Sequence, residues 1–144
     1  MKIRPAESED LDAIKALLVE SELPVADVNA ALVMDFLVAE DAGGKIVGSV
    51  GLERFGNHAL LRSLAVSSTT RGSGLGRSLM AHAEGTARSC GISQLWLLTT
   101  TAADFFRRGD YAAANRNTAP DELQASTQFS LLCPATAVCM KKEL

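Results

Sequence analysis

Polar and apolar residues at the start of the chain predict a short strand followed by two helices. Residues 2–5 have the pattern of a strand, and Ser8 can cap the helix that follows. Leu23-Pro24 interrupts this helix, and a second amphipathic segment opens at Asp27. The apolar positions that recur at helical spacing in the first helix are Leu11, Ile14, Leu17 and Leu18.

The middle of the chain has the composition of buried strands. Residues 36–40 and 45–54 flank Asp41-Ala42-Gly43-Gly44, whose glycines permit positive φ, so the pair predicts a β-hairpin. Residues 59–66 form a dense apolar run, which is typical of a central strand. Downstream, the pattern predicts a helix over 75–90 ended by Gly91, a strand over 94–100, a short helix over 101–108, a turn over 109–111, a helical turn over 120–125 and a strand over 136–141.

No repeat, linker or low-complexity stretch divides these elements. Helices on both sides of a mixed sheet account for the pattern, which indicates an α/β (α+β) layer architecture. We expect one domain over residues 1–144, and 47% hydrophobic residues suffice for one core.

The charge balance excludes some function classes. The chain carries 14 basic and 17 acidic residues without a basic block, so nucleic-acid binding is not expected. No apolar run approaches the roughly 20 residues of a membrane span, and the first residues lack the apolar segment of a signal peptide. We therefore expect a cytoplasmic protein without a membrane segment.

Cysteine and histidine spacing predicts no metal site. Cys90, Cys133 and Cys139 form an odd set without C-x-x-C spacing, which favours reduced thiols over a disulfide framework or a zinc site. His58 falls in a predicted turn and His82 on a helix, and neither has the spacing of a metal ligand.

A glycine-rich stretch joins the strand over 59–66 to the following helix. In Arg71-Gly72-Ser73-Gly74-Leu75-Gly76, the glycines leave the main chain open to an anion, and the helix N-terminus, Arg71 and Arg77 add positive potential. This pattern indicates a phosphate cradle, although an ordinary turn has the same residues. A nucleotide P-loop would need a lysine after the last glycine, and a dinucleotide fingerprint would follow the first strand. This loop meets neither condition, so both kinds of nucleotide site are disfavoured.

Two motifs in order resemble the GNAT superfamily of N-acetyltransferases. Leu64-Ala65-Val66, a short connection and residues 71–76 are similar to its central motif, and residues 102–111 are similar to its later Ala-x-x-Phe-Tyr segment. The resemblance extends nearly end to end. It implies a mixed, mostly antiparallel sheet, flanked by helices and splayed in the middle between residues 64–66 and 95–98.

The same resemblance implies acetyl-CoA as co-substrate. Amides of residues 71–77 would hold its pyrophosphate, and the strand near Leu64, with a bulge at Leu64 and Ala65, would pair with the pantetheine arm. The predicted cofactor-binding residues are Leu64, Ala65, Val66, Arg71, Gly72, Ser73, Gly74, Leu75, Gly76, Arg77 and Phe106.

The catalytic residues depart from the family pattern. Leu60 stands where many relatives place a glutamate base, and Phe106 where they place a tyrosine acid. An alkyl ammonium with a pKa of about 10.4 must lose a proton before attack, so a carboxylate base is expected. Glu53 is the nearest candidate, its alternative being a solvated strand-end residue, and Tyr111 or water would assist the departing thiolate.

The acceptor residues are predicted from strand phase. Arg62 is in phase with Leu60, so it would face the acceptor and clamp an anionic group, or else form a structural ion pair under the sheet. Arg116 is a second candidate. Four segments, residues 61–64, 97–102, 127–129 and 132–134, resemble the arsenic-resistance N-acetyltransferases.

That narrower resemblance implies acetylation of a small-molecule amine, such as an amino acid with an arsonate-like or phosphinate-like head. Alternatives are an unrelated amine, a protein lysine, a noncatalytic acyl-CoA sensor, or an interaction domain whose glycine loop is only a turn. A homodimer is the family-level expectation.

Overall fold

The computed structural model describes residues 1–134 and 136–144, and in them the chain forms a seven-stranded sheet with strand order β1-β2-β3-β4-β5-β7-β6. Neighbouring strands are antiparallel except β4 and β5, which are parallel. The strands are β1 (Lys2–Pro5), β2 (Phe36–Glu40), β3 (Ile46–Phe55), β4 (His58–Val66), β5 (Gln94–Thr99), β6 (Ala112–Ala113) and β7 (Val138–Glu143). The predicted mixed, mostly antiparallel sheet is confirmed.

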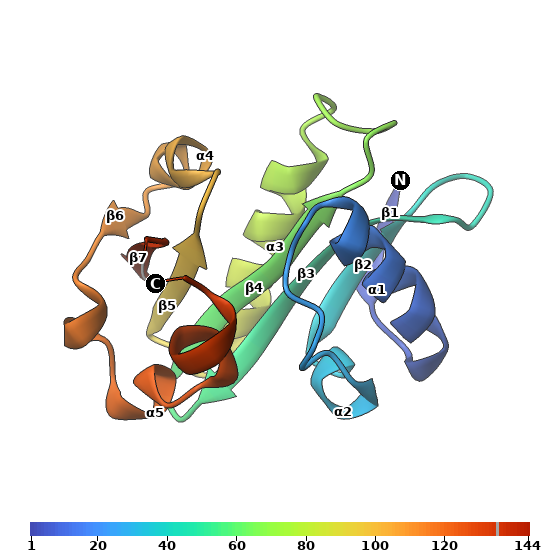
Figure 1. Ribbon diagram of the computed structural model, residues 1–144. Coiled ribbons are helices and arrows are strands. Elements are labelled where there is room, and N and C mark those ends of the chain that lie inside the picture. Colours follow the sequence, from blue (N-terminus) through green and yellow to red (C-terminus); the bar gives the residue numbers. More distant parts are fainter. Residues whose placement is uncertain (135) are drawn as a thin grey trace.

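Helices cover both faces of this sheet (Figure 1). The longest, α3, packs on β3 and β4 from one side, whereas α1 packs on the same strands from the other. The helices are α1 (Leu11–Glu20), α2 (Ala30–Val33), α3 (Leu75–Ser89), α4 (Ala103–Arg108), α5 (Asp121–Gln124), the short 3-10 turns η1 (Ser8–Asp10) and η2 (Arg116–Thr118), and the π-helical turn η3 (Gln128–Leu132).

Apolar side chains of β4 point alternately into the two layers. Leu61 belongs to the core under α3, whereas Leu60 packs with Trp96 and with Leu123 of α5. The α3 side is packed closely enough that a Cβ on Gly48 would lie 2.8 Å from Leu79. The residue type at Gly48 is therefore set by the approach of α3 to the sheet.

The sheet opens between β4 and β5. The two strands pair only from His58 and Gln94 to Leu60 and Trp96, although β4 continues to Val66. This confirms the predicted splay and leaves one edge of residues 61–66 without a neighbouring strand in the described chain.

A bulge accompanies the opening. On β3, Ser49 pairs with Ala65 and Gly51 with Arg62, so β4 has one extra residue in this interval. Ser63 takes it up with a φ of 57°, in the left-handed region. The bulge lies beside Leu64 and Ala65, where the sequence predicted it. It turns both Arg62 and Ala65 toward the α1 side of the sheet.

The helix starts in the N-terminal part differ from the prediction. Helix α2 begins at Ala30, because the Asn29 side chain accepts a hydrogen bond of 2.9 Å from the amide of Leu32. Asp27, the predicted start, lies in the preceding loop, where its carboxylate contacts Arg62. Ser8 lies inside η1 and the turn is capped from Glu7, where Asp10 accepts the Glu7 amide at 2.8 Å.

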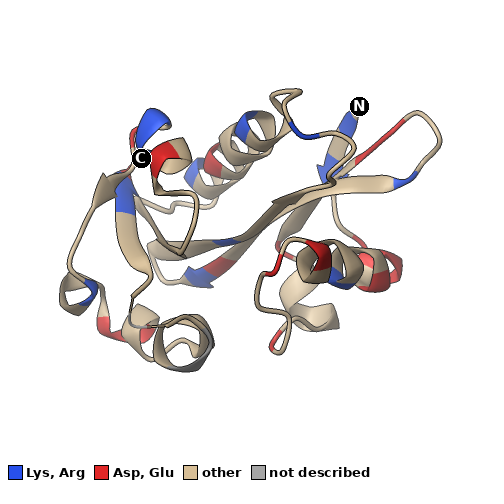
Figure 2. Cartoon of the chain, turned by 45° about the horizontal axis from the view of Figure 1, so that its top comes forward, with Lys and Arg blue, Asp and Glu red and all other residues tan. Residues whose placement is uncertain are grey.

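Charged residues are spread over the chain. Figure 2 shows Lys and Arg distributed over several elements and intermixed with Asp and Glu. In the part of the chain that the structure describes, no helix has both the length and the apolar character needed to cross a membrane.

Candidate active site

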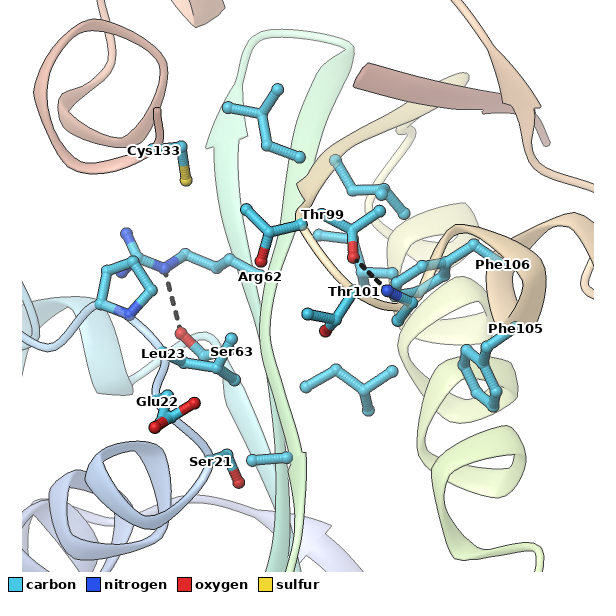
Figure 3. Close-up of a pocket in the computed structure, with 18 of the residues that line it drawn as sticks. Ser21, Glu22, Leu23, Arg62, Ser63, Thr99, Thr101, Phe105, Phe106 and Cys133 are labelled. Carbon is cyan, nitrogen blue, oxygen red and sulfur yellow. Dashed lines mark hydrogen bonds between the residues drawn. The ribbon is translucent and has the colours of Figure 1, made fainter. Parts of the chain in front are cut away.

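A cavity of about 560 Å³ occupies the opening between β4 and β5 (Figure 3). One wall is β4 from Leu61 to Val66, and the opposite wall is the end of β5 with the connection to α4, residues 97–102. Residues 21–24, which follow α1, and Gln128, Cys133 and Pro134 close its sides. The splay predicted from the sequence therefore contains a cavity, bordered by four segments that are distant in the sequence.

The glycine loop meets one end of this cavity at Arg71 and Gly76. Gly72 and Gly74 have φ values of 83° and 82°, a region that residues with a Cβ rarely adopt, and Gly74 is the N-cap of α3. Within the described chain, the amides of residues 71–77 donate to no protein acceptor, the first helical bond being Ser78 N to Gly74 O at 3.1 Å. This row of amides at a helix N-terminus has the chemistry of a pyrophosphate site.

The loop is held in place by its own polar side chains. Ser73 Oγ donates to the Thr70 carbonyl at 2.6 Å, and Arg71 Nε donates to the Val66 carbonyl at 3.1 Å. Leu75 is buried under the sheet beside Gly48, so its side chain anchors α3 rather than lining the large cavity. Of the predicted cofactor residues, those that line the large cavity are Leu64, Ala65, Val66, Arg71, Gly76 and Phe106, and those at the loop outside it are Gly72, Ser73, Gly74, Leu75 and Arg77.

Two phenylalanines form the apolar wall at α4. Phe105 and Phe106 both line the cavity, and their rings meet edge to face at a centroid distance of 5.2 Å. Thr99 Oγ1 accepts the amide of Ala102 at 3.0 Å, which fixes the turn from β5 into α4. The motif that suggested a tyrosine at position 106 thus supplies a hydrophobic surface instead of a hydroxyl.

Arg62 lies at the other end of the cavity in a buried ion-pair cluster. Its side chain is 0% exposed and forms two bonds to Asp27, with Nη1–Oδ2 at 2.5 Å and Nη2–Oδ1 at 2.6 Å. Nη1 also donates to Glu53 Oε1 at 3.0 Å, and Nε donates to Ser63 Oγ at 3.2 Å. Although burial opposes the charge, the two carboxylates hold the pKa of Arg62 above its ordinary value. Of the two predicted roles, this structure shows the ion pair.

Glu53 is positioned by the same cluster. It lies opposite Leu60 in the register of β3 and β4, and one of its carboxylate oxygens accepts from Arg62. Glu53 is not among the described residues that line the cavity. A base function of Glu53 therefore requires a relay through water.

Tyr111 lies away from the cavity. It is 2% exposed, its ring meets Phe106 edge to face, and its hydroxyl donates to Glu84 Oε2 at 2.9 Å. Lys142 Nζ donates to the other oxygen of Glu84 at 2.9 Å, so the three residues tie α3 to β7. Burial and then the Glu84 charge raise the pKa of Tyr111 far above its ordinary value. This geometry speaks against the proton-donor role predicted for Tyr111.

Arg116 contacts the segment that borders the cavity and does not point into the cavity itself. Nη1 donates to the Pro134 carbonyl at 2.8 Å and Nη2 to the Phe129 carbonyl at 2.6 Å. Its guanidinium also lies 5.5 Å from the centre of the Phe129 ring. Arg116 is not among the described lining residues, and its predicted acceptor contact is replaced by a role in fastening the segment after α5.

Three parts of the site have no counterpart in the sequence-based prediction of site residues. They are the loop over residues 21–24, the carboxylate of Asp27 and the buried Gln128. Residues 127–129 carried a signal, since they belong to a segment that resembles the arsenic-resistance group. The loop and Asp27 carried no sequence signal of a role in the site, because their proximity to β4 depends on long-range packing.

The remaining candidate chemistry at the site is limited. Burial raises the pKa of the Cys133 thiol, which lines the cavity, and that of Cys139 on β7. In the described residues, no group of three or more His, Cys, Asp or Glu side chains could hold a metal ion.

Solved structures share this fold over nearly the whole chain. N-acetylglutamate synthase from Neisseria gonorrhoeae, complexed with coenzyme A and N-acetyl-glutamate, is 24% identical with a TM-score of 0.86, over 99% of this chain and 35% of that one. Rv2747 from Mycobacterium tuberculosis, in complex with CoA, is 23% identical with a TM-score of 0.84, over 100% and 99%. A GNAT-family acetyltransferase from Staphylococcus aureus Mu50 is 15% identical with a TM-score of 0.78, over 99% and 98%.

The chain spans 35% of the length of the N-acetylglutamate synthase. Residues 34–112, more than half of the chain, match the family model described as acetyltransferase (GNAT) domain. The matched region contains the sheet opening, the glycine loop and α4, and it confirms the predicted family. The chain therefore belongs to the GNAT family of acetyltransferases.

Proposed function

We propose that this protein transfers the acetyl group of acetyl-CoA to the amine of a small molecule. The observation that carries the proposal is the continuity of the cavity, which runs along the unpaired edge of β4 from Arg71 and Gly76 to Arg62. A pyrophosphate on the amides of residues 71–77 would direct the pantetheine arm along residues 64–66. The acetyl group would then lie near the bulge at Ser63.

In the reaction, a carbon–nitrogen bond replaces the carbon–sulfur bond of the thioester, and a proton passes from the amine to a base. The neutral amine nitrogen attacks the acetyl carbonyl carbon, the carbon–sulfur bond breaks, and the amine proton leaves to a base. A main-chain amide near the bulge would stabilise the oxyanion, an effect worth about 3 kcal/mol for one donor. A thiol pKa of about 8.5 makes the thiolate a leaving group that needs little protonation at neutral pH, which fits Phe106 in place of a tyrosine.

For the base, we propose Glu53 acting through water. Its carboxylate is fixed by Arg62 at 3.0 Å and remains 23% exposed, so a water molecule can reach it. Asp27 is the other carboxylate of the cluster, but both of its oxygens are occupied by Arg62. Glu53 therefore has the more available oxygen.

A small acceptor fits the enclosure of the site better than a protein lysine does. The loop at residues 21–24 and the segment with Gln128, Cys133 and Pro134 border the acceptor end. N-acetylglutamate synthase, which shares this fold, was solved with N-acetyl-glutamate, which supports an amino-acid-like acceptor. The resemblance of residues 97–102, 127–129 and 132–134 to the arsenic-resistance group supports an arsonate-like or phosphinate-like head on that amino acid.

An acceptor screen tests this proposal. The wild-type protein is mixed with acetyl-CoA and amino acids that carry carboxylate, phosphinate or arsonate heads, and with lysine peptides, while free thiol and acetylated product are measured. We expect turnover with at least one amino-acid-like acceptor. Acetylation of the peptides alone would contradict the small-molecule assignment.

A further inference from the structure

We propose that the side-chain amide of Gln128 recognises an oxygen atom in the head group of the acceptor, which makes Gln128 a specificity-determining residue. This inference rests on the proposed function, because it concerns the small-molecule acceptor of the same site. It assigns a role to η3, a segment for which the GNAT resemblance predicted none.

Gln128 is buried at the cavity. It is the first residue of η3, is 4% exposed, and lines the cavity together with Cys133, whose amide donates to the Gln128 carbonyl at 3.0 Å. The polar neighbours of Gln128 are paired locally, since Ser130 Oγ donates to the Ser126 carbonyl at 2.7 Å. The amide of Gln128, by contrast, has no hydrogen-bond partner among the residues that the structure describes.

The amide of Gln128 borders the cavity and is not one of the fully buried side-chain groups that lack a partner in the described residues, which are Ser21 Oγ and His58 Nδ1. Native proteins pair the large majority of their polar groups with protein atoms, water or a ligand. Gln124, one turn earlier in the chain, shows the usual arrangement, because its Nε2 donates to the Ala119 carbonyl at 2.8 Å. Since Gln128 adjoins the cavity, the partner we infer is a ligand.

The charges around the cavity favour Gln128 as the donor to that ligand. The charged lining residues are Glu22, Arg62 and Arg71. Arg62 is paired with two carboxylates, and Arg71 lies at the glycine loop, where it donates to Val66. An oxygen-bearing head at the acceptor end would therefore find the uncommitted N–H groups on the Gln128 amide.

The chemical class of the head follows from this donor. A primary amide presents two N–H groups, which suit a carboxylate, phosphinate or arsonate oxygen equally well. Gln128 thus selects acceptors that carry an oxygen-rich head and discriminates against amines with an aliphatic end.

Kinetics of two variants test the inference. Gln128→Leu removes both donors, and Gln128→Glu keeps the shape while replacing the donors with a negative charge. For an anionic-head acceptor we expect Gln128→Leu to raise KM about ten- to a hundredfold, the range for one hydrogen bond to a charged group, with kcat within about threefold. Gln128→Glu should raise KM further, and a methyl-headed amine of equal length should show no change.

Controls separate recognition from folding. Gln94→Leu alters an amide that bonds Glu143 at the far end of β5, so it should leave every KM unchanged. Thermal protection by CoA should be the same in the wild type and both Gln128 variants. An unchanged KM for anionic-head acceptors in Gln128→Leu would overturn the inference.

A binding readout distinguishes this failure from failure of the proposed function. Thermal shifts of the CoA-bound protein are measured with each acceptor. If an acceptor shifts the wild type but not Gln128→Leu, and no acetyl transfer occurs, the proposed function fails and the role of Gln128 holds. If no acceptor with an oxygen-rich head shifts the wild type, the inference is overturned.

Discussion

Arg62 and Asp27 form a bidentate ion pair across 35 positions of sequence, with N–O distances of 2.5 and 2.6 Å. The pair fastens the loop after α1 to the bulged part of β4. It does so at the acceptor end of the cavity, where the side chain of Arg62 is fully buried. The shape of the acceptor site is consequently linked to the stability of this pair.

Asp27→Ala tests that link. The change leaves Arg62 buried with Glu53 as its only carboxylate, so we expect the free energy of unfolding to fall by about 3 kcal/mol. Asp35→Ala is a matched control, because Asp35 pairs with Arg54 at the surface, at 3.0 Å with 40% and 46% of the side chains exposed. That change should cost no more than about 1 kcal/mol in urea unfolding. Equal losses in the two variants would contradict the structural importance of Asp27.

Glu53→Gln tests the base. The amide oxygen can still accept from Arg62, so the fold should be kept, whereas proton abstraction through water is lost. We expect kcat to fall at least tenfold, because general-base catalysis typically contributes a factor of about 10² to 10⁴. The KM for acetyl-CoA should be unchanged. Glu122→Gln on the exposed face of α5 serves as control. A kcat equal to that of the wild type across the pH range would assign Glu53 to the ion pair alone.

Gly74→Ala tests the pyrophosphate loop. A Cβ at Gly74 meets no neighbouring atom within 4 Å, but the φ of 82° imposes strain of about 1–2 kcal/mol on any residue other than glycine. Relief of that strain would reorient the amides at the start of α3, so we expect the KM for acetyl-CoA to rise about tenfold. Gly85→Ala, in the interior of α3 with open space around it, should leave that KM unchanged. The idea fails if both variants bind acetyl-CoA like the wild type.

Alkaline stability tests the position of Tyr111. The pKa of Tyr111 in the folded protein is raised by burial and by Glu84, whereas in the unfolded chain the pKa is about 10. Above that pH, the unfolded state loses the tyrosine proton while the folded state keeps it. The contribution of Tyr111 to the stability of the fold is therefore complete below a pH of about 10 and decreases as the pH rises further. Tyr111→Phe should lower stability by about 1–2 kcal/mol at neutral pH and remove this part of the alkaline slope.

The chain contains a single tyrosine, so tyrosinate absorbance reports this residue alone. We expect tyrosinate to appear only together with unfolding. Ionisation of Tyr111 in the folded protein near its ordinary pKa would contradict the buried bond to Glu84. We also expect Tyr111→Phe to retain kcat within about threefold.

The sequence allowed the elements with strong local patterns to be predicted. Helix α3 follows from the apolar spacing between Leu75 and Ala87, and β2 agrees with the prediction at both ends. The glycine loop was recognisable because positive φ at Gly72 and Gly74 restricts the residue type. Local chemistry determines these features, and so a single sequence contains them.

Features that depend on distant residues could not be predicted. Asn29 rather than Asp27 caps α2, and the Asp27 carboxylate instead forms an ion pair with Arg62 of β4, which is distant in the sequence. The direction of Tyr111 toward Glu84 and the burial of Gln128 depend on how β7 and η3 pack. Spacing along the chain contains no information on such contacts.

The number of CoA thiols released per protein chain, from excess acetyl-CoA and the best acceptor of the screen, tests the central claim most directly. We predict many thiols released per chain, with an equal amount of N-acetylated product and loss of release in Gly74→Ala at low acetyl-CoA. Tight acetyl-CoA binding with at most one thiol released per chain, whatever the amine, would contradict an acetyltransferase and indicate a sensor.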